Sequence, residues 1–229
     1  SSFSGSVPLI SLLDHIASHS FHGVLFCFSN RDKHFFGRTP ELLVEQKNDE
    51  IRSEALAGTA DQKSLAFLQN AKIDEEFSIV AEHIKCVLER HTQKLFIEER
   101  RISQASNIFH VKQPFSGAIC SNFSLHRLIQ ELHPTPALGG SPKEKAKSFI
   151  EKTEQHFRGN YSHPFGILSK SHSKLYIALR CAQLQQNKLL LYSGAGIVKN
   201  SDPSLEWREL NLKLHLWKPL LPQNAKLST

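Results

Sequence analysis

A glycine-rich turn between a short apolar strand and an acidic helix constrains this chain more than any other segment. Residues 192–198 have the sequence Tyr-Ser-Gly-Ala-Gly-Ile-Val, and a helix is predicted to follow from Pro203. Glu206 and Glu209 are three residues apart and therefore share one face of that helix. Lys213, one turn further on, lies on the same face. The segment thus predicts a tight turn next to paired carboxylates.

This arrangement suits an anionic ligand held partly through a metal ion. Gly194 and Gly196 allow backbone N–H groups to approach an anion closely. The two glutamates supply oxygen ligands, and no Cys or His lies between them. Oxygen donors of this kind favour Mg²⁺ over zinc. The sequence therefore predicts a magnesium site beside a backbone cradle for a carboxylate.

The remaining pattern predicts an α+β protein with antiparallel sheets. Strands occur in hairpin-like runs and helices in blocks, without the alternation that parallel sheets require. Ser141-Pro142, followed by Glu144, predicts a helix start with a serine N-cap and a capping box. The predicted strands are Gly23–Phe28, His34–Glu45, Glu50–Ala57, Ile108–Ala118, Leu175–Ala182 and Lys188–Ser193, and the predicted helices are Leu9–Ser18, Gln62–Thr92, Leu125–Leu132 and Pro203–Leu214.

Composition excludes several classes of protein. The 229 residues carry a net charge of +6, and the basic residues are scattered rather than gathered into a nucleic-acid-binding stripe. The charge favours either an anionic small-molecule substrate or an ordinary mixed surface. No apolar run is long enough to cross a membrane, and no secretory leader is visible. Four cysteines without paired spacing indicate reduced thiols in a cytoplasmic protein, expected to be a monomer or weak oligomer.

Four further motifs precede the glycine turn in a fixed order. They are Thr39-Pro40-Glu41-Leu42-Leu43, Ala57-Gly58-Thr59, Glu82-His83 and His133-Pro134-Thr135-Pro136-Ala137 with Gly139-Gly140. Together with the turn they cover nearly the whole chain. The set resembles the chorismate-utilising enzymes, which include isochorismate, salicylate, anthranilate and aminodeoxychorismate synthases. The resemblance is greatest to isochorismate synthase.

The resemblance implies a fold and an activity. It implies an antiparallel β-sandwich with helices packed outside, formed by residues 1–229 as one chorismate-binding catalytic domain that lacks the usual N-terminal portion. The implied reaction is the Mg²⁺-dependent conversion of chorismate to isochorismate, in which water adds to the ring and a ring hydroxyl leaves. Chorismate would be the small-molecule partner.

The resemblance also implies roles for the catalytic residues. Glu41 would be the general acid that protonates the departing hydroxyl. Pro40 and the leucines after Glu41 indicate a partly buried setting, which raises a carboxyl pKa. His110, after a strand, would lie near the substrate ring. Glu54 is left without a catalytic role.

The resemblance also implies which residues bind the metal and the substrate. Glu82 and Glu209 are expected to bind the metal, with Glu206 as an outer ligand through water; the alternative for Glu82 is a solvated helix face beside Lys85. Arg180 would hold a substrate carboxylate in bidentate fashion. We expect the charged members of the site to converge on one cleft. The full substrate-binding set is Gly58, Thr59, Ala137, Tyr161, Arg180, Gly194, Gly196 and Lys213.

Two alternatives remain open. Another reaction of the family, of the salicylate or anthranilate type, is one; Ala137 favours the isochorismate type, because salicylate synthases often place threonine there. A non-catalytic chorismate-binding protein is the other. Isochorismate synthases activate water with a lysine on a strand upstream of the Thr-Pro-Glu motif, whereas the first lysine here is Lys33, in a predicted turn. We therefore expect the chain as given to make little isochorismate.

Overall fold

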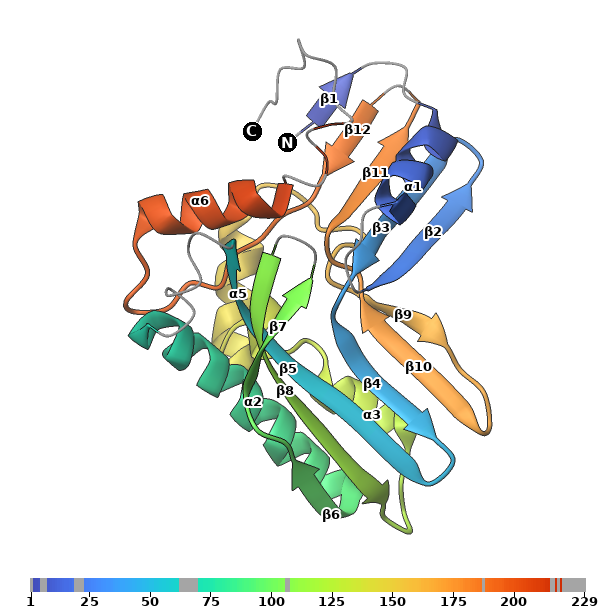
Figure 1. Ribbon diagram of the computed structural model, residues 1–229, viewed down its shortest axis with the longest axis vertical. Coiled ribbons are helices and arrows are strands. Elements are labelled where there is room, and N and C mark those ends of the chain that lie inside the picture. The colour runs from blue at the N-terminus through green and yellow to red at the C-terminus, as the bar shows by residue number, and fades with distance from the viewer. Residues whose placement is uncertain are drawn as a thin grey trace.

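The computed structural model describes residues 2–4, 8–18, 23–61, 70–105, 108–186, 188–214, 217 and 219. Within these residues the strands form two antiparallel sheets flanked by helices (Figure 1). The five-stranded sheet has the order β1 (Ser2–Ser4), β12 (Lys188–Leu191), β11 (Cys181–Gln185), β3 (Lys33–Thr39) and β2 (Val24–Asn30). The seven-stranded sheet has the order β6 (Thr92–Ile97), β8 (Ile108–Ile119), β5 (Glu50–Asp61), β4 (Leu42–Lys47), β10 (His172–Ile177) and β9 (Pro164–Ile167), with β7 (Arg101–Ala105) also paired to β8. The predicted α+β class is confirmed.

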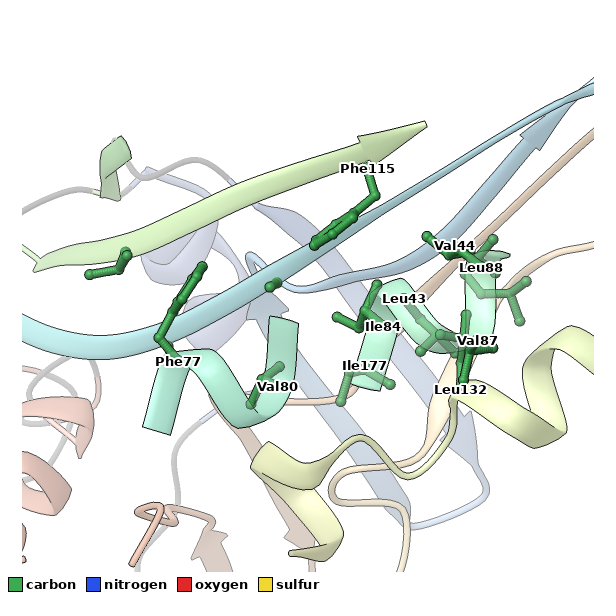
Figure 2. Close-up of a cluster of buried hydrophobic side chains, with 14 of the residues drawn as sticks. Leu43, Val44, Phe77, Val80, Ile84, Val87, Leu88, Phe115, Leu132 and Ile177 are labelled. Carbon is green, nitrogen blue, oxygen red and sulfur yellow. The ribbon is translucent and has the colours of Figure 1, made fainter. Parts of the chain in front are cut away.

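The main core lies between helix α2 (Ala71–His91) and one face of the seven-stranded sheet (Figure 2). Apolar residues of this helix form a buried stripe, and Phe77 and Ile84 are among its members. Residues of β5 alternate between this core and the opposite, more exposed face, as the period of two in a strand requires. The helix begins at Ala71, where the Asn70 Oδ1 accepts the Ile73 N–H at 2.9 Å. Residues 62–69 of the predicted helix lie outside the described residues.

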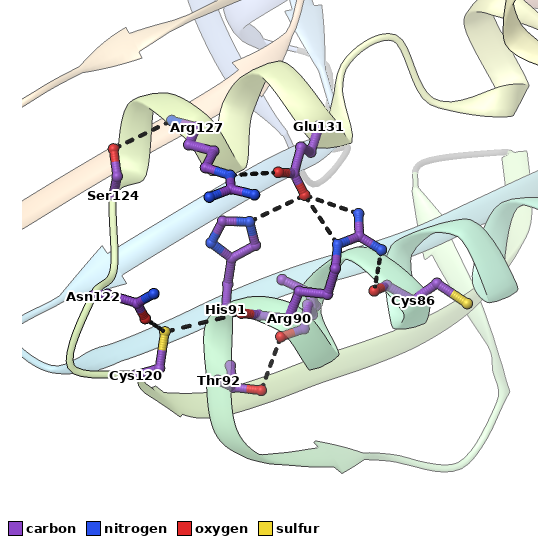
Figure 3. Close-up of polar contacts among 10 residues, drawn as sticks. Cys86, Arg90, His91, Thr92, Cys120, Asn122, Ser124, Arg127 and Glu131 are labelled. Atoms are coloured by element: carbon purple, nitrogen blue, oxygen red, sulfur yellow. Dashed lines mark hydrogen bonds and ion pairs between the residues drawn. The ribbon is translucent and has the colours of Figure 1, made fainter.

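Helix α3 (Leu125–Leu132) is joined to α2 by a carboxylate shared between cations (Figure 3). Glu131 Oε2 accepts a hydrogen bond from Arg90 Nη2 at 2.8 Å, and Glu131 Oε1 accepts one from Arg127 Nε at 2.8 Å. His91 Nε2 lies 3.2 Å from the same carboxylate. Hydrogen bonds from Arg90 and Arg127 lower the pKa of Glu131 to about 2. The network therefore fixes α3 on α2.

The five-stranded sheet has a smaller core of its own. Helix α1 (Leu9–Ser18) packs on it through Leu12 and Ile16, and Trp217 completes the cluster. The Trp217 ring meets Phe36 edge-on, with centroids 5.8 Å apart. Cys27, Cys86, Cys120 and Cys181 form no disulfide in the structure. In the described part of the chain, no helix is both long and apolar enough to cross a membrane.

Two segments predicted as single strands are each broken, and both breaks fall where the chain passes from one sheet to the other. The predicted strand His34–Glu45 divides into β3 and β4 around Pro40-Glu41. The predicted strand Leu175–Ala182 divides into β10 and β11 around Arg180, which has a φ of +47°. The two crossings lie side by side, because Ile177 N–H donates to the Glu41 carbonyl at 3.0 Å. Apolar periodicity did not reveal either break.

The segment after α3 contains two short helices, α4 (Pro136–Gly139) and α5 (Lys143–Thr153). The predicted helix start at Ser141-Pro142 is one residue too early. Pro142 is the N-cap of α5, and no side chain caps this end of the helix. The serine capping box is therefore not formed.

Candidate active site

Glu41 and Arg180 occupy the two sheet crossings and form the centre of the candidate site. Both are only partly exposed. Desolvation of the Glu41 carboxyl raises its pKa from 4.5 to about 7, although the positive charges of Lys213 and Arg180 oppose this shift. Desolvation lowers the pKa of the Arg180 guanidinium to about 10, opposed by Glu41. The site therefore combines a carboxylic acid that is partly protonated near neutrality with a fixed positive charge.

His110 orients Arg180. The buried ring has its Nδ1 atom 2.6 Å from the carbonyl oxygen of Gly58, and its Nε2 contacts Arg180 Nη2. Because the Gly58 oxygen can only accept, Nδ1 carries the proton and Nε2 accepts from the guanidinium. Burial, and then the charge of Arg180, lowers the pKa of His110 to about 3, so the ring is neutral. Gly58 reaches this position with a φ of +70°.

A second part of the site is a buried cluster of carboxylates around one lysine. Lys72 Nζ lies 3.2 Å from Glu76 Oε2, 3.0 Å from Glu206 Oε1 and 3.6 Å from Glu209 Oε2. The four side chains are each between 7% and 14% exposed. Helix α6 (Pro203–Leu214) brings Glu206 and Glu209 to the N-terminal end of α2 (Figure 1).

The glycine turn connects the carboxylate cluster to the rest of the site. Lys213 Nζ lies 2.8 Å from Glu209 Oε1 and donates a hydrogen bond to the Gly194 carbonyl at 2.7 Å. A Cβ added at Gly194 would lie 2.7 Å from the Tyr161 hydroxyl, and one added at Gly196 would clash with Glu76 Oε1. Both glycines therefore lie in close contact with side chains of the site.

The structure thus brings together most of the residues that the sequence predicted. Glu41, His110, Arg180 and Gly58 form one set, and Glu206, Glu209, Lys213, Tyr161, Gly194 and Gly196 form the adjoining set. Ala137 lies in α4 and packs against the main core. Thr59 belongs to β5, but its side chain lies outside the described part of the structure. Glu54 pairs with Lys112 at 2.7 Å on the exposed face of the sheet.

Glu82 is not part of this site, contrary to the expectation that it would converge with Glu209. Its side chain is 62% exposed and pairs with Lys85 at 3.4 Å. Glu76, six residues earlier on α2, occupies the place in the cluster that was predicted for Glu82. Six residues along a helix correspond to a different face. Glu76 is three residues after Ile73 and four before Val80, both buried, and this spacing is the sequence feature that could have identified it.

The cluster suits a divalent cation that prefers oxygen ligands. Glu76, Glu206 and Glu209 offer carboxylate oxygens only, and Glu206 Oε2 is buried without a hydrogen bond. Such ligands match Mg²⁺. As arranged around Lys72, however, no group of three acidic, His or Cys side chains among the described residues forms a ready metal cage. The three carboxylates are therefore of the right chemical type for Mg²⁺, whereas the distances between them in this structure suit the ammonium group of Lys72.

A groove of about 550 Å³ opens beside His110, on the face of the seven-stranded sheet away from α2. It is lined mainly by polar and charged side chains of β5, β8 and β10. Pro40 and His110 connect it to the candidate site, whereas Glu41 and Arg180 do not line it.

Comparison with known proteins identifies the family. Residues 1–221 match the family model described as chorismate binding enzyme. The chain belongs to the chorismate-binding enzyme family. It is 33% identical over 202 residues to the chloroplastic isochorismate synthase of Catharanthus roseus, covering 83% of this chain and 35% of that protein. It is 30% identical over 228 residues to the salicylate biosynthesis isochorismate synthase of Pseudomonas aeruginosa, covering 95% and 48%.

Solved structures in this family have the same fold. The menaquinone-specific isochorismate synthase MenF of Escherichia coli superimposes with a TM-score of 0.85 at 27% identity. The match covers 96% of this chain and 54% of that chain. The chain spans about half the length, or less, of the curated relatives it matches.

Proposed function

We propose that this chain contains the site for the Mg²⁺-dependent conversion of chorismate to isochorismate. One observation carries the proposal: a desolvated carboxyl, Glu41, has a pKa near 7 and lies in the field of Arg180 and Lys213. A general acid is most effective when its pKa is near the working pH. Similarity to named isochorismate synthases supports the choice of reaction.

Arg180 and the glycine turn would bind the anionic groups of the substrate. The guanidinium of Arg180 is largely desolvated, and its orientation is fixed by His110, so it can hold a carboxylate without reorganising. Gly194 and Gly196 expose backbone close to the carboxylate cluster. Tyr161, stacked on Tyr192 with centroids 5.4 Å apart, places its hydroxyl beside Gly194 as a further donor.

Glu76, Glu206 and Glu209 would hold Mg²⁺, with Glu76 replacing Glu82 in the proposed ligand set. The ion would neutralise and orient a substrate carboxylate. Lys213, paired with Glu209 and the Gly194 carbonyl, would connect the ion to the backbone cradle.

The chemical step assigned to this chain is proton donation by Glu41. Protonated Glu41 gives its proton to the hydroxyl that departs from the ring as water, and the carboxylate that remains is stabilised by Arg180 and Lys213. A second water adds to the ring and loses a proton to a base. Lys213 is a poor candidate for that base, because its ammonium donates to a carboxylate and a carbonyl.

A second candidate function is a protein that binds chorismate without converting it. It is favoured because no residue has been assigned as the base for the water that adds to the ring. Among the described residues, the contacts of the site do not identify a group positioned to deprotonate water. Salicylate or anthranilate formation is the alternative reaction within the family. Both alternatives would use the same binding site. The non-catalytic protein would form no product, and the alternative enzyme would form salicylate or anthranilate.

Incubation with chorismate and Mg²⁺, followed by chromatographic separation of products, tests the proposal. Isochorismate as the product supports it, and salicylate with pyruvate, or anthranilate when ammonia is supplied, would contradict it. Calorimetric binding of chorismate without any product would identify the non-catalytic alternative. Glu41→Gln should abolish turnover and leave chorismate affinity nearly unchanged, since an acid acts on the transition state.

A further inference from the structure

We propose that Lys72 is an internal cation that competes with Mg²⁺ for the carboxylate cluster and leaves the cluster when the metal binds. The inference rests on the Mg²⁺ site proposed above. It assigns Lys72 a role in metal affinity.

Geometry indicates that the ammonium and the metal exclude each other. Lys72 Nζ is 3.0 to 3.6 Å from one oxygen each of Glu76, Glu206 and Glu209. Magnesium requires oxygens at about 2.0–2.1 Å in octahedral geometry. The carboxylates must therefore close by about 1 to 1.5 Å around Mg²⁺, and no room then remains for Nζ among them.

Burial and charge explain why one cation or the other must be present. Three carboxylates carry a charge of −3, and Glu206 Oε2 is buried without a hydrogen bond. Lys213 pairs directly with Glu209 and acts on Glu76 only at longer range. Without Lys72 or a metal, Glu76 and Glu206 would be buried negative charges with no directly paired cation among the described residues, which is strongly unfavourable.

Lys72 is the cation better suited to leave. It is the second residue of α2, where the helix dipole disfavours a positive charge. Its ion pairs in the cluster are all to carboxylates that a metal would bind instead. Lys213, by contrast, is also held by the Gly194 carbonyl.

Calorimetric titration with MgCl₂ alone tests this competition. Lys72→Met should bind Mg²⁺ at least about tenfold more tightly than the wild type, corresponding to about 1.4 kcal/mol. Lys85→Met is the matched control, because Lys85 is on the same helix and pairs with exposed Glu82; it should leave the affinity unchanged. In the presence of a chelator, Lys72→Met should have a lower Tm than the wild type. Adding Mg²⁺ should raise the Tm of Lys72→Met by more than it raises the Tm of the wild type.

A labelling experiment on the wild type is independent of how the variant folds. Reductive methylation followed by mass spectrometry should modify Lys72 slowly in chelator and faster with Mg²⁺, while Lys85 reacts equally in both. If the wild type binds Mg²⁺ but Lys72→Met binds it no more tightly, or Lys72 labelling does not change, the competition is refuted and the metal site stands. If neither protein binds Mg²⁺, the metal site itself is refuted, and this inference with it.

Discussion

Replacing Glu41 by glutamine should flatten the dependence of folding stability on pH near neutrality. Desolvation raises the pKa of Glu41 from 4.5 to about 7, so between these values the folded protein keeps a proton that the unfolded chain has lost. A raised folded-state pKa gives stability that is fully present below about pH 4.5 and is lost as the pH rises through about 7. Glutamine has nearly the same shape and does not ionise, so this loss disappears in Glu41→Gln.

The size of the effect follows from the two pKa values of Glu41. Between about pH 5 and about pH 8, this group alone should remove about 2–3 kcal/mol from the free energy of unfolding. The opposing charges of Lys213 and Arg180 are already included in the folded-state value. Groups that titrate elsewhere are common to both proteins and cancel in the comparison.

Urea unfolding at both pH values, followed by tryptophan fluorescence, measures the difference. The wild type should lose stability relative to Glu41→Gln as the pH rises, whereas Glu151→Gln, on the exposed helix α5, should behave like the wild type. Parallel pH profiles of the wild type and Glu41→Gln would refute the interpretation of Glu41 as a desolvated acid.

Three further predictions concern the metal, a helix contact and His110. Glu76→Gln should abolish Mg²⁺ binding in calorimetry and Glu82→Gln should leave it intact; the reverse result would restore Glu82 as the ligand. Glu131→Gln removes a carboxylate that accepts from Arg90 and Arg127, and it should lower the free energy of unfolding at pH 7 by about 1–2 kcal/mol. The effect is no larger because both arginines are largely exposed and their charges are screened. The difference should shrink as the pH falls from about 4.5 towards 2, where Glu131 becomes protonated. By NMR, His110 should stay neutral down to about pH 4; titration near pH 6.5 would contradict its desolvated setting.

The sequence was sufficient for features that depend on local pattern. The apolar stripe of α2 has helical spacing, so most of its buried face could be predicted from the sequence. The glycine turn and the acidic helix after it are contiguous in sequence, so it was also predictable that they would lie next to each other in the site. Glu41 was correctly expected to have a raised pKa, because its apolar neighbours indicate burial.

The features that could not be predicted depend on contacts distant in sequence. His110 meets Gly58 across 52 residues and Arg180 across 70, and neither contact has a local pattern. The choice between Glu76 and Glu82 depends on which part of α2 lies beside the glutamates of α6. A dipeptide motif indicated Glu82, whereas burial, which only the fold defines, selects Glu76.

The positions of Glu41 and Arg180 at the two sheet crossings have a mechanical consequence. Each residue stands where the chain passes from one sheet to the other, so the burial of the Glu41 carboxyl depends on how the two sheets pack together. The Trp217 and Phe36 pair lies in the core of the five-stranded sheet. A substitution in that core can therefore shift the acidity of Glu41 without touching it, and the protonation of this one carboxyl becomes a measure of how completely both halves of the protein are assembled.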